Sequence, residues 1–330
     1  MPENSRYLRQ SKVIGSEGQQ QLKNTKLLVV GAGGLGTLVS SFLVAAGVGK
    51  ITLMDEDTIA ITNLTRQIVY SEKDCGQAKV LVLEKYLNSL NSECEINTYA
   101  SFLNHSNADD IIAKHDVVVD CSDNFVSKYL VSDSCNLSNK PLITASIEGF
   151  NGQVIVLLPN ICYRCIFLDA KANASCSNGD VIGPAVGIIA SVQANEVFKL
   201  ITGLNSQSQL IQIDSLTNIV SNYTLNSNPG CINNHEVQLA SYEPQTKSLA
   251  WREIVKLHHN TGLKLIDIRK IAVTPLPAET ILATIETITR LTIPKNQPLA
   301  VICNYGYTSK LAALKLAAIG YQQVYYTKFG

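Results

Sequence analysis

A short apolar run followed directly by closely spaced glycines constrains this chain more than any other feature. The run, Lys26–Val30, has the length of a buried strand, and a helical pattern follows over 38–46. The glycines between them are Gly31, Gly33, Gly34 and Gly36. Glycine lets a backbone approach a phosphate, and the start of a helix offers unpaired N–H groups. The pattern predicts a nucleotide-binding turn, in preference to glycines that serve only helix–strand packing.

Strand and helix patterns alternate after this turn. Further strands are expected at 50–54, 116–120, 141–145 and 153–158, and helices at 77–90, 108–114 and 125–137. This alternation predicts an α/β fold, a Rossmann-like parallel sheet covered on both faces. A polar loop is expected over 160–184, then a helix over 187–201 and a strand over 210–214.

Length and composition suggest two domains. At about 150 residues per domain, 330 residues predict two, and the polar stretch 238–247 is typical of a linker. We therefore expect one domain over 1–240 and a smaller α/β domain over 241–330. The latter should contain strands at 264–268, 299–303 and 322–326 and a helix at 309–319.

Charge and hydropathy exclude several functions. Basic and acidic residues both number 27, which argues against broad electrostatic capture of nucleic acid or an anionic membrane. No stretch reaches about 18 apolar residues, and the start resembles no signal peptide, so a cytoplasmic location is expected. Nine cysteines in a reducing compartment indicate metal binding or thiol chemistry rather than disulfides.

Charged residues gather at the expected carboxyl ends of the strands. Asp55 follows the second strand, where it could accept hydrogen bonds from ribose hydroxyls. Arg66, Lys79 and Asp123 lie in segments that return to the same edge of the sheet. Two cations beside an acid suggest a magnesium triphosphate. The glycine turn and Asp55 taken alone leave an NAD-dependent oxidoreductase open.

Six ordered motifs now identify a family resemblance. They are R-Y-x-R-Q (from Arg6), G-A-G-G-L-G (Gly31), D-x-D (Asp55 and Asp57), N-L-x-R-Q (Asn63), G-Q-x-K (Gly76) and D-C-x-D-N (Asp120). Together they resemble the MoeB/ThiF family of adenylyltransferases, relatives of ubiquitin-activating enzymes, over about residues 5–235.

The resemblance implies ATP-dependent adenylation of the C-terminal glycine of a small ubiquitin-fold sulfur carrier by a homodimer. Sulfur transfer giving a thiocarboxylate would serve molybdopterin, thiamine or tRNA thiolation pathways. The implied roles put Asp55 on the ribose, Arg66 and Lys79 on the phosphates, and Asp123 on Mg²⁺. Arg9 would reach the ATP of the opposite subunit. The nucleotide-binding set is completed by Gly31, Gly33, Gly34, Gly36, Asp57 and Asn63.

The cysteine spacing predicts a structural zinc site. Cys162 and Cys165 form a C-x-x-C, and Cys231 follows a turn 66 residues after Cys165. A redox-active C-x-x-C is the alternative. The family closes its zinc site with a second C-x-x-C, which this chain lacks, so His235 is the expected fourth ligand. Cys176 resembles the family's loop cysteine, a candidate for sulfur or acyl transfer and otherwise a polar-loop thiol of no consequence.

The C-terminal domain resembles a rhodanese. Cys303 ends an expected strand and opens a loop before a helix, an arrangement that stabilises a thiolate or persulfide. Asp267-Ile268-Arg269 resembles an earlier rhodanese motif. The loop lacks the customary arginines, so two alternatives stay open: a sulfurtransferase supplied by a cysteine desulfurase, or a degenerate docking module.

Overall fold

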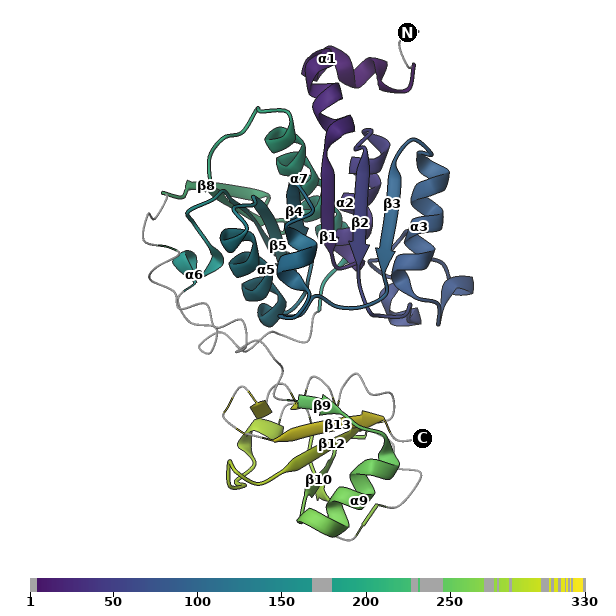
Figure 1. Cartoon of the computed structure of the whole chain (residues 1–330), viewed down its shortest axis with the longest axis vertical. Helices are drawn as coiled ribbons and strands as arrows, with labels where there is room; N and C mark the ends of the chain where they lie inside the picture. The colour runs from purple at the N-terminus through teal and green to yellow at the C-terminus, as the bar shows by residue number, and fades with distance from the viewer. Residues whose placement is uncertain are drawn as a thin grey trace. The chain divides into compact units, whose positions relative to one another are not determined.

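The structure is a computed structural model that divides into two compact units, Met1–Gln238 and Leu239–Gly330 (Figure 1). We call them the first and second units and describe each by itself. The residues described are 5–167, 180–226, 231, 246–269, 276–277, 279–284, 287–303, 309, 312–313, 316–317, 319, 321 and 323–328. Among them, no helix is both long and apolar enough to cross a membrane.

The first unit is built on an eight-stranded sheet of order β3-β2-β1-β4-β5-β6-β7-β8. The strands are β1 (Lys26–Val30), β2 (Lys50–Met54), β3 (Glu95–Tyr99), β4 (Val117–Asp120), β5 (Leu142–Glu148), β6 (Asn151–Leu157), β7 (Gln209–Asp214) and β8 (Ile219–Thr224). The expected parallel Rossmann-like sheet is confirmed from β3 to β5, whereas β5 to β8 pair antiparallel. The run expected as a further parallel strand, β6, turns back on β5 because only two residues join them and a parallel crossover needs a dozen or more.

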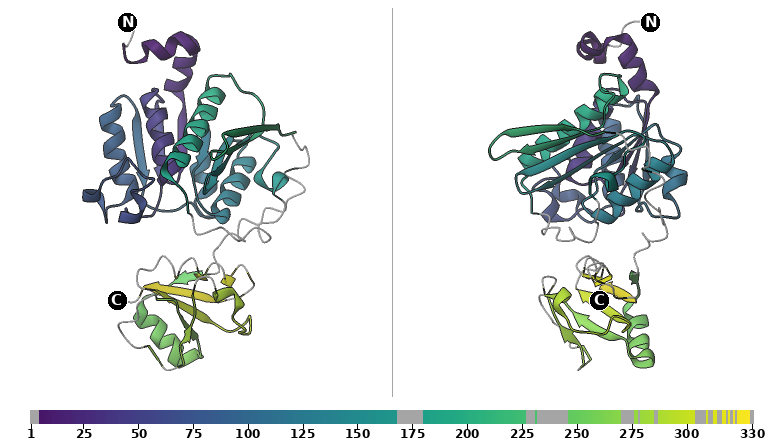
Figure 2. Two further views of the ribbon diagram at one scale, coloured as in Figure 1. Left: turned by 180° about the vertical axis from the view of Figure 1, so that it is seen from behind. Right: turned by 90° about the vertical axis from the view of Figure 1, so that its left-hand side faces the viewer.

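Helices cover both faces of this sheet (Figure 2). They are α1 (Leu8–Asn24), α2 (Gly34–Ala45), α3 (Lys79–Leu90), α4 (Ala108–Ile112), α5 (Phe125–Leu137), α6 (Tyr163–Ile166) and α7 (Gly183–Ile201), with 3₁₀ turns at Ser5–Tyr7, Ile61–Asn63 and Glu72–Asp74. Helices α2, α3 and α7 contribute to one buried apolar core with β1 and β2. Helix α7 begins earlier than expected because Pro184, which lacks an N–H, occupies its first turn.

Two glycines allow α2 to start directly against the end of β1. Gly31 has a φ of +100°, and a Cβ there would lie 2.9 Å from the carbonyl oxygen of Cys121. A Cβ on Gly36 would lie 1.8 Å from the oxygen of Gly31. Side chains at either position would therefore push the helix away from the strand.

A buried histidine makes the stability of the first unit depend on pH. His115 Nδ1 lies 2.8 Å from Ile111 O, Nε2 lies 2.8 Å from Thr52 Oγ1, and burial lowers the pKa of the ring. As the pH falls below about 6.5, His115 binds a proton in the unfolded chain before it does so in the folded chain. The free energy of unfolding that is present above this pH therefore decreases as the pH falls. We expect His115→Gln to reduce this loss, measured by urea unfolding at about pH 7 and about pH 5. Parallel losses in both proteins would contradict this.

The second unit is a smaller parallel sheet of order β11-β10-β12-β13-β9. Its elements are β9 (Thr246–Ser248), α9 (Trp251–Thr261), β10 (Lys264–Asp267), β11 (Ile281–Leu282), a 3₁₀ turn (Ile288–Arg290), β12 (Leu299–Cys303) and β13 (Val324–Lys328). Strand β9 occupies the end of the stretch expected to be a linker. Strand β12 is buried throughout, since apolar side chains pack on both of its faces. Of the helix expected at 309–319, the described residues 309, 312–313 and 316–317 are helical.

Candidate functional site

Three loops converge where β1, β2 and β4 end. Strand β1 pairs with β2 on one side and β4 on the other, so the chain order reverses at β1. Gly31 N donates to Met54 O at 2.8 Å, and Cys121 N donates to Val30 O at 2.8 Å. Such a reversal point is where open α/β sheets bind ligands. The glycine turn therefore lies between the loops that carry Asp55 and Asp123.

The Asp55 carboxylate is fixed against the glycine turn. Its Oδ2 accepts a hydrogen bond from Ala32 N at 2.7 Å, and its Oδ1 accepts one from Asp57 N at 2.8 Å. Burial raises the pKa of Asp55, whereas nearby Lys79 and the two N–H donors act in the opposite direction. The structure thus places an oriented acceptor beside the turn, as expected of a ribose-binding residue.

Lys79 reaches the same edge of the sheet, paired with Asp57. Its Nζ lies 2.8 Å from Asp57 Oδ2, and its side chain is buried while that of Asp57 is half exposed. Lys79 N also donates to Asp57 O at 3.0 Å. The hydroxyl of Tyr70 donates to Ala32 O at 2.9 Å, tying the glycine turn to the same region. Both charged residues are expected at the nucleotide, but their ion pair could not be predicted from the motif spacing.

Asn63 shapes the turn that presents Arg66. Asn63 Oδ1 accepts from Ala60 N at 3.0 Å, and Asn63 O accepts from Arg66 N at 3.1 Å. A Cβ on Gly34 would lie 3.6 Å from Arg66 Cγ and 2.9 Å from Val186 Cγ1. Arg66 therefore lies beside the first residue of α2, where the helix dipole also favours an anion. Gly34 provides the room for this approach.

A buried ion pair holds the loop that carries Asp123. Asp120 Oδ1 accepts from Ser122 N at 3.0 Å, and Oδ2 lies 2.9 Å from Lys128 Nζ and accepts from Thr144 Oγ1 at 2.6 Å. Lys128 Nζ donates further to Ala145 O at 2.7 Å. Lys128 is 3% exposed and Asp120 is 0% exposed. This pair was not predicted, although a lysine among the apolar residues of the expected helix 125–137 was a signal of it.

Asp123 itself is exposed in this loop. The next residue, Asn124, caps α5, because its Oδ1 accepts from Ser127 N at 2.9 Å. The loop is thus anchored on both sides of Asp123, by the ion pair before it and by the helix cap after it. An exposed carboxylate on an anchored loop is suited to binding a hydrated cation.

Arg9 is not brought to this edge within its own chain. It is exposed on α1, which leads into the first residue of β1. Figure 1 shows α1 at the end of the sheet where β1 begins, opposite the carboxyl ends. The structure thus separates Arg9 from Asp55 and Asp123 within one chain.

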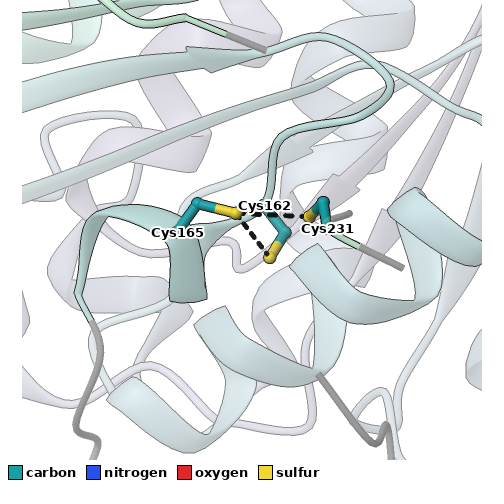
Figure 3. Close-up of side chains that lie close together, drawn as sticks. All are labelled: Cys162, Cys165 and Cys231. Carbon is teal, nitrogen blue, oxygen red and sulfur yellow. Dashed lines mark hydrogen bonds between the residues drawn. The ribbon is translucent and has the colours of Figure 1, made fainter. Parts of the chain in front are cut away.

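Three cysteines form a separate cluster (Figure 3). Cys162 Sγ lies 3.7 Å from Cys165 Sγ, which lies 3.3 Å from Cys231 Sγ, and all three sulfurs lie within 4.8 Å of one another. Tetrahedral zinc with Zn–S bonds of about 2.3 Å separates its sulfurs by about 3.8 Å, so the cluster fits three zinc ligands. His235, the expected fourth ligand, and Cys176 lie outside the described residues.

Helix α5 supports this cluster. Ser132 Oγ accepts from Tyr163 N at 2.8 Å, and Asp133 Oδ2 lies 3.0 Å from Arg164 Nε. One turn further, Asn136 Nδ2 donates to Cys231 Sγ at 3.5 Å. Residues three and four positions apart share one helix face, so a single face of α5 contacts both segments that provide the cysteines.

Cys303 ends β12 in the second unit and is buried. Ser309 N donates to its sulfur at 3.2 Å, and Ser309 Oγ donates to Thr327 O at 2.8 Å. Two residues after the end of neighbouring β10, Arg269 donates two 2.9 Å hydrogen bonds to Asp267, the last residue of that strand, and both side chains are buried. A backbone N–H directed at sulfur is the feature that the rhodanese resemblance implies. Residues 304–308 of the loop lie outside the described residues.

Comparison with known proteins assigns the family. The model of the ThiF family matches residues 6–233, which include all the strand-end residues described above. The chain belongs to the ThiF family. A sulfur carrier protein adenylyltransferase of Thermus thermophilus is 38% identical over 230 residues, covering 66% of this chain and 85% of that protein.

Two further relatives extend this ThiF-family assignment. The adenylyltransferase and sulfurtransferase MOCS3 of Dictyostelium discoideum is 43% identical over 194 residues, covering 57% of this chain and 46% of the relative. The chain spans about half the length of the MOCS3 proteins that it matches. E. coli MccB, solved with ATP, superimposes with a TM-score of 0.59 and 29% identity, covering 69% of this chain and 74% of MccB.

Proposed function

We propose that this ThiF-family chain uses ATP to adenylate the C-terminal glycine of a small ubiquitin-fold sulfur carrier. The observation that carries the proposal is the convergence of Asp55, Arg66, Lys79 and Asp123 around one glycine turn. The similarity to the sulfur carrier protein adenylyltransferase of Thermus thermophilus and to MccB, solved with ATP, supports it. The glycine turn also suits an NAD-dependent oxidoreductase, but ThiF-family membership favours ATP.

The residues suit attack of a carboxylate on the α-phosphorus of ATP. The glycine carboxylate forms a new bond to phosphorus as the bond to pyrophosphate breaks, so negative charge grows on the phosphoryl oxygens. Arg66 would stabilise that charge, as would Lys79 once the triphosphate replaces Asp57 as its partner. Asp123 would hold Mg²⁺, which neutralises phosphate charge when bound. No covalent protein nucleophile is needed for this step.

Carrier-dependent exchange of pyrophosphate into ATP tests the proposal. The purified chain is incubated with ATP, labelled pyrophosphate and, in turn, carriers of the molybdopterin, thiamine and tRNA thiolation pathways. Exchange with one carrier, lost when the carrier's last glycine is removed, is the expected result. Binding of NAD without exchange would contradict the proposal and favour the oxidoreductase. Capture of the chain's own carrier during adenylation, followed by mass measurement, would identify the pathway.

A homodimer would complete the site. Arg9 lies on α1 at the far end of its own sheet, so its expected contact with ATP requires a second copy. An arginine delivered in this way would place a further positive charge on the triphosphate. The proposed assembly therefore has two nucleotide sites, each containing Arg9 from the other subunit. We propose a cytoplasmic location for it.

We propose that the cysteine cluster binds zinc, with His235 as the fourth ligand. We expect about one zinc per chain in purified protein. Cys231→Ser should lower both the zinc content, measured by elemental analysis, and the melting temperature, because a metal that binds the folded state stabilises it. The exposed Cys75 provides the matched control, Cys75→Ser. Full-length protein without zinc would contradict the assignment.

Sulfur transfer is the proposed role of the rhodanese-like second unit. A cysteine desulfurase would load Cys303 with a persulfide, whose terminal sulfur attacks the adenylated carrier and displaces AMP, giving an acyl disulfide. A second thiol then attacks the Cys303 sulfur, so that the S–S bond breaks and the thiocarboxylate leaves. Cys303 and that thiol are left as a disulfide, which a thiol reductant must reduce before the next cycle. Cys176 remains a candidate for that thiol. The N–H of Ser309, 3.2 Å from Cys303 Sγ, supports this role because it would stabilise a sulfur anion.

Cys303→Ala should therefore separate the two activities. We expect the variant to keep pyrophosphate exchange and to lose desulfurase-driven thiocarboxylate formation, followed by mass measurement of the carrier. Cys94→Ala, which removes a buried thiol from the first unit, is the control. If the Cys303 variant still transfers sulfur, the second unit acts only as a docking module.

A further inference from the structure

Gln67 is a buried polar residue of the N-L-x-R-Q motif to which no role has been assigned. Its side chain is 3% exposed. Its backbone is held by two hydrogen bonds, from its N to Asn63 O at 2.9 Å and from Tyr70 N to its O at 3.0 Å. A Cβ on Gly33 would lie 3.7 Å from Gln67 Nε2. The carboxamide therefore lies against the glycine turn, at the start of α2.

The oxygen of this carboxamide lacks a hydrogen-bond partner among the described residues. Gln67 Oε1 is buried and unpaired. Gln193, another buried glutamine of the first unit, differs: its Nε2 donates to Asp120 O at 2.9 Å and to Ile143 O at 3.2 Å, and its Oε1 accepts from Cys121 Sγ at 3.5 Å. Buried polar groups are nearly always paired in native proteins, and an unpaired one lowers stability. Gln67 thus has the character of a group whose partner is a ligand.

We infer that the Gln67 carboxamide binds a phosphate group of the nucleotide at the start of α2. The inference rests on the proposed use of ATP. The two ends of a carboxamide exchange places by a half-turn, so the buried end can present an N–H to a phosphate oxygen. Arg66 is adjacent in sequence, and the helix N-terminus favours an anion at the same place. The N–H of the neutral Gln67 carboxamide, next to Arg66, would orient the phosphate group without adding charge to the site.

Gln67→Met separates this role from a structural one. Methionine has a similar volume and no polar group, so the variant without ligand should melt at or above the wild-type temperature. Its dissociation constant for Mg·ATP, measured by calorimetry, should rise about tenfold or more, since a hydrogen bond to a charged group is lost. The KM for ATP in exchange should rise with it. Adenosine, which lacks phosphate, should bind both proteins equally.

Gln67→Glu tests the charge of the ligand. A carboxylate against a phosphate should weaken ATP binding more than methionine does, whereas a contact to a ribose hydroxyl would tolerate it. Gln20→Glu is the matched control, because Gln20 is exposed on α1 and donates to Asn24 Oδ1 at 3.0 Å. Unchanged ATP affinity in Gln67→Met, or equal losses for ATP and adenosine, would overturn the inference. A wild-type chain that fails to bind ATP would instead contradict the proposed function, and this inference with it.

Discussion

Replacing Lys128 by methionine is expected to lower the free energy of unfolding of the first unit by about 3–5 kcal/mol. The change removes the cation from a buried pair in which Lys128 is 3% exposed and Asp120 is 0% exposed. The Asp120 carboxylate would remain buried without its counter-charge, and Ala145 O would lose its donor. Urea unfolding of the full chain, followed by a signal from the first unit, measures the effect.

The control for Lys128 is a second lysine in a close ion pair. Lys50 Nζ lies 2.6 Å from Glu95 Oε1, but the two side chains are 32% and 62% exposed. Lys50→Met should change stability far less, because water screens an exposed pair. Adding Asp120→Asn to Lys128→Met should recover part of the lost stability, since no isolated charge is then buried. Equal effects of the two single lysine changes would contradict the importance of burial.

Replacing Asp123 by alanine is expected to reduce carrier-dependent pyrophosphate exchange by about 10²–10³-fold. The residue is exposed on a loop anchored by Asp120 and Asn124, and the proposed Mg²⁺ would act on charge that develops as pyrophosphate leaves. The loss should appear with no change in melting temperature, because an exposed side chain contributes little to the core. Initial rates over a range of Mg²⁺ concentrations measure it.

Asp110→Ala is the control for Asp123→Ala. Asp110 is an exposed carboxylate on α4 that belongs to none of the six motifs. Its removal changes the net charge by the same amount and should leave exchange unchanged. Near-normal exchange in Asp123→Ala would show that Mg²⁺ is held elsewhere.

Local sequence pattern predicts the buried elements of the first unit well. Strands β1 and β2 and helix α5 have the expected bounds, because continuous apolar runs and a capping asparagine determine them locally. Helix α1 and strand β8 were not expected, since α1 is rich in polar residues and β8 is mostly exposed. The direction of β6 depends on the short turn before it rather than on its own composition.

In the candidate site, too, the sequence predicts where residues lie but not the contacts that orient them. Motif spacing placed Asp55 and Asp123 after two strands of one sheet, and in the structure these strands, β2 and β4, lie on either side of β1. The contacts that orient them could not be predicted, since they join residues distant in sequence. Lys128, for example, bonds to Ala145, and the orphan oxygen of Gln67 appears only when the surrounding loops are in place.

Helix α5 joins two parts of the first unit that otherwise have separate chemistry. Its first turn closes the loop of Asp123, and Ser132, Asp133 and Asn136 support the cysteine cluster. Inserting one residue in the middle of this helix would rotate the later positions by about 100° relative to the earlier ones. The length and phase of α5 are therefore constrained from both ends, so that the two sites cannot change independently during evolution or redesign.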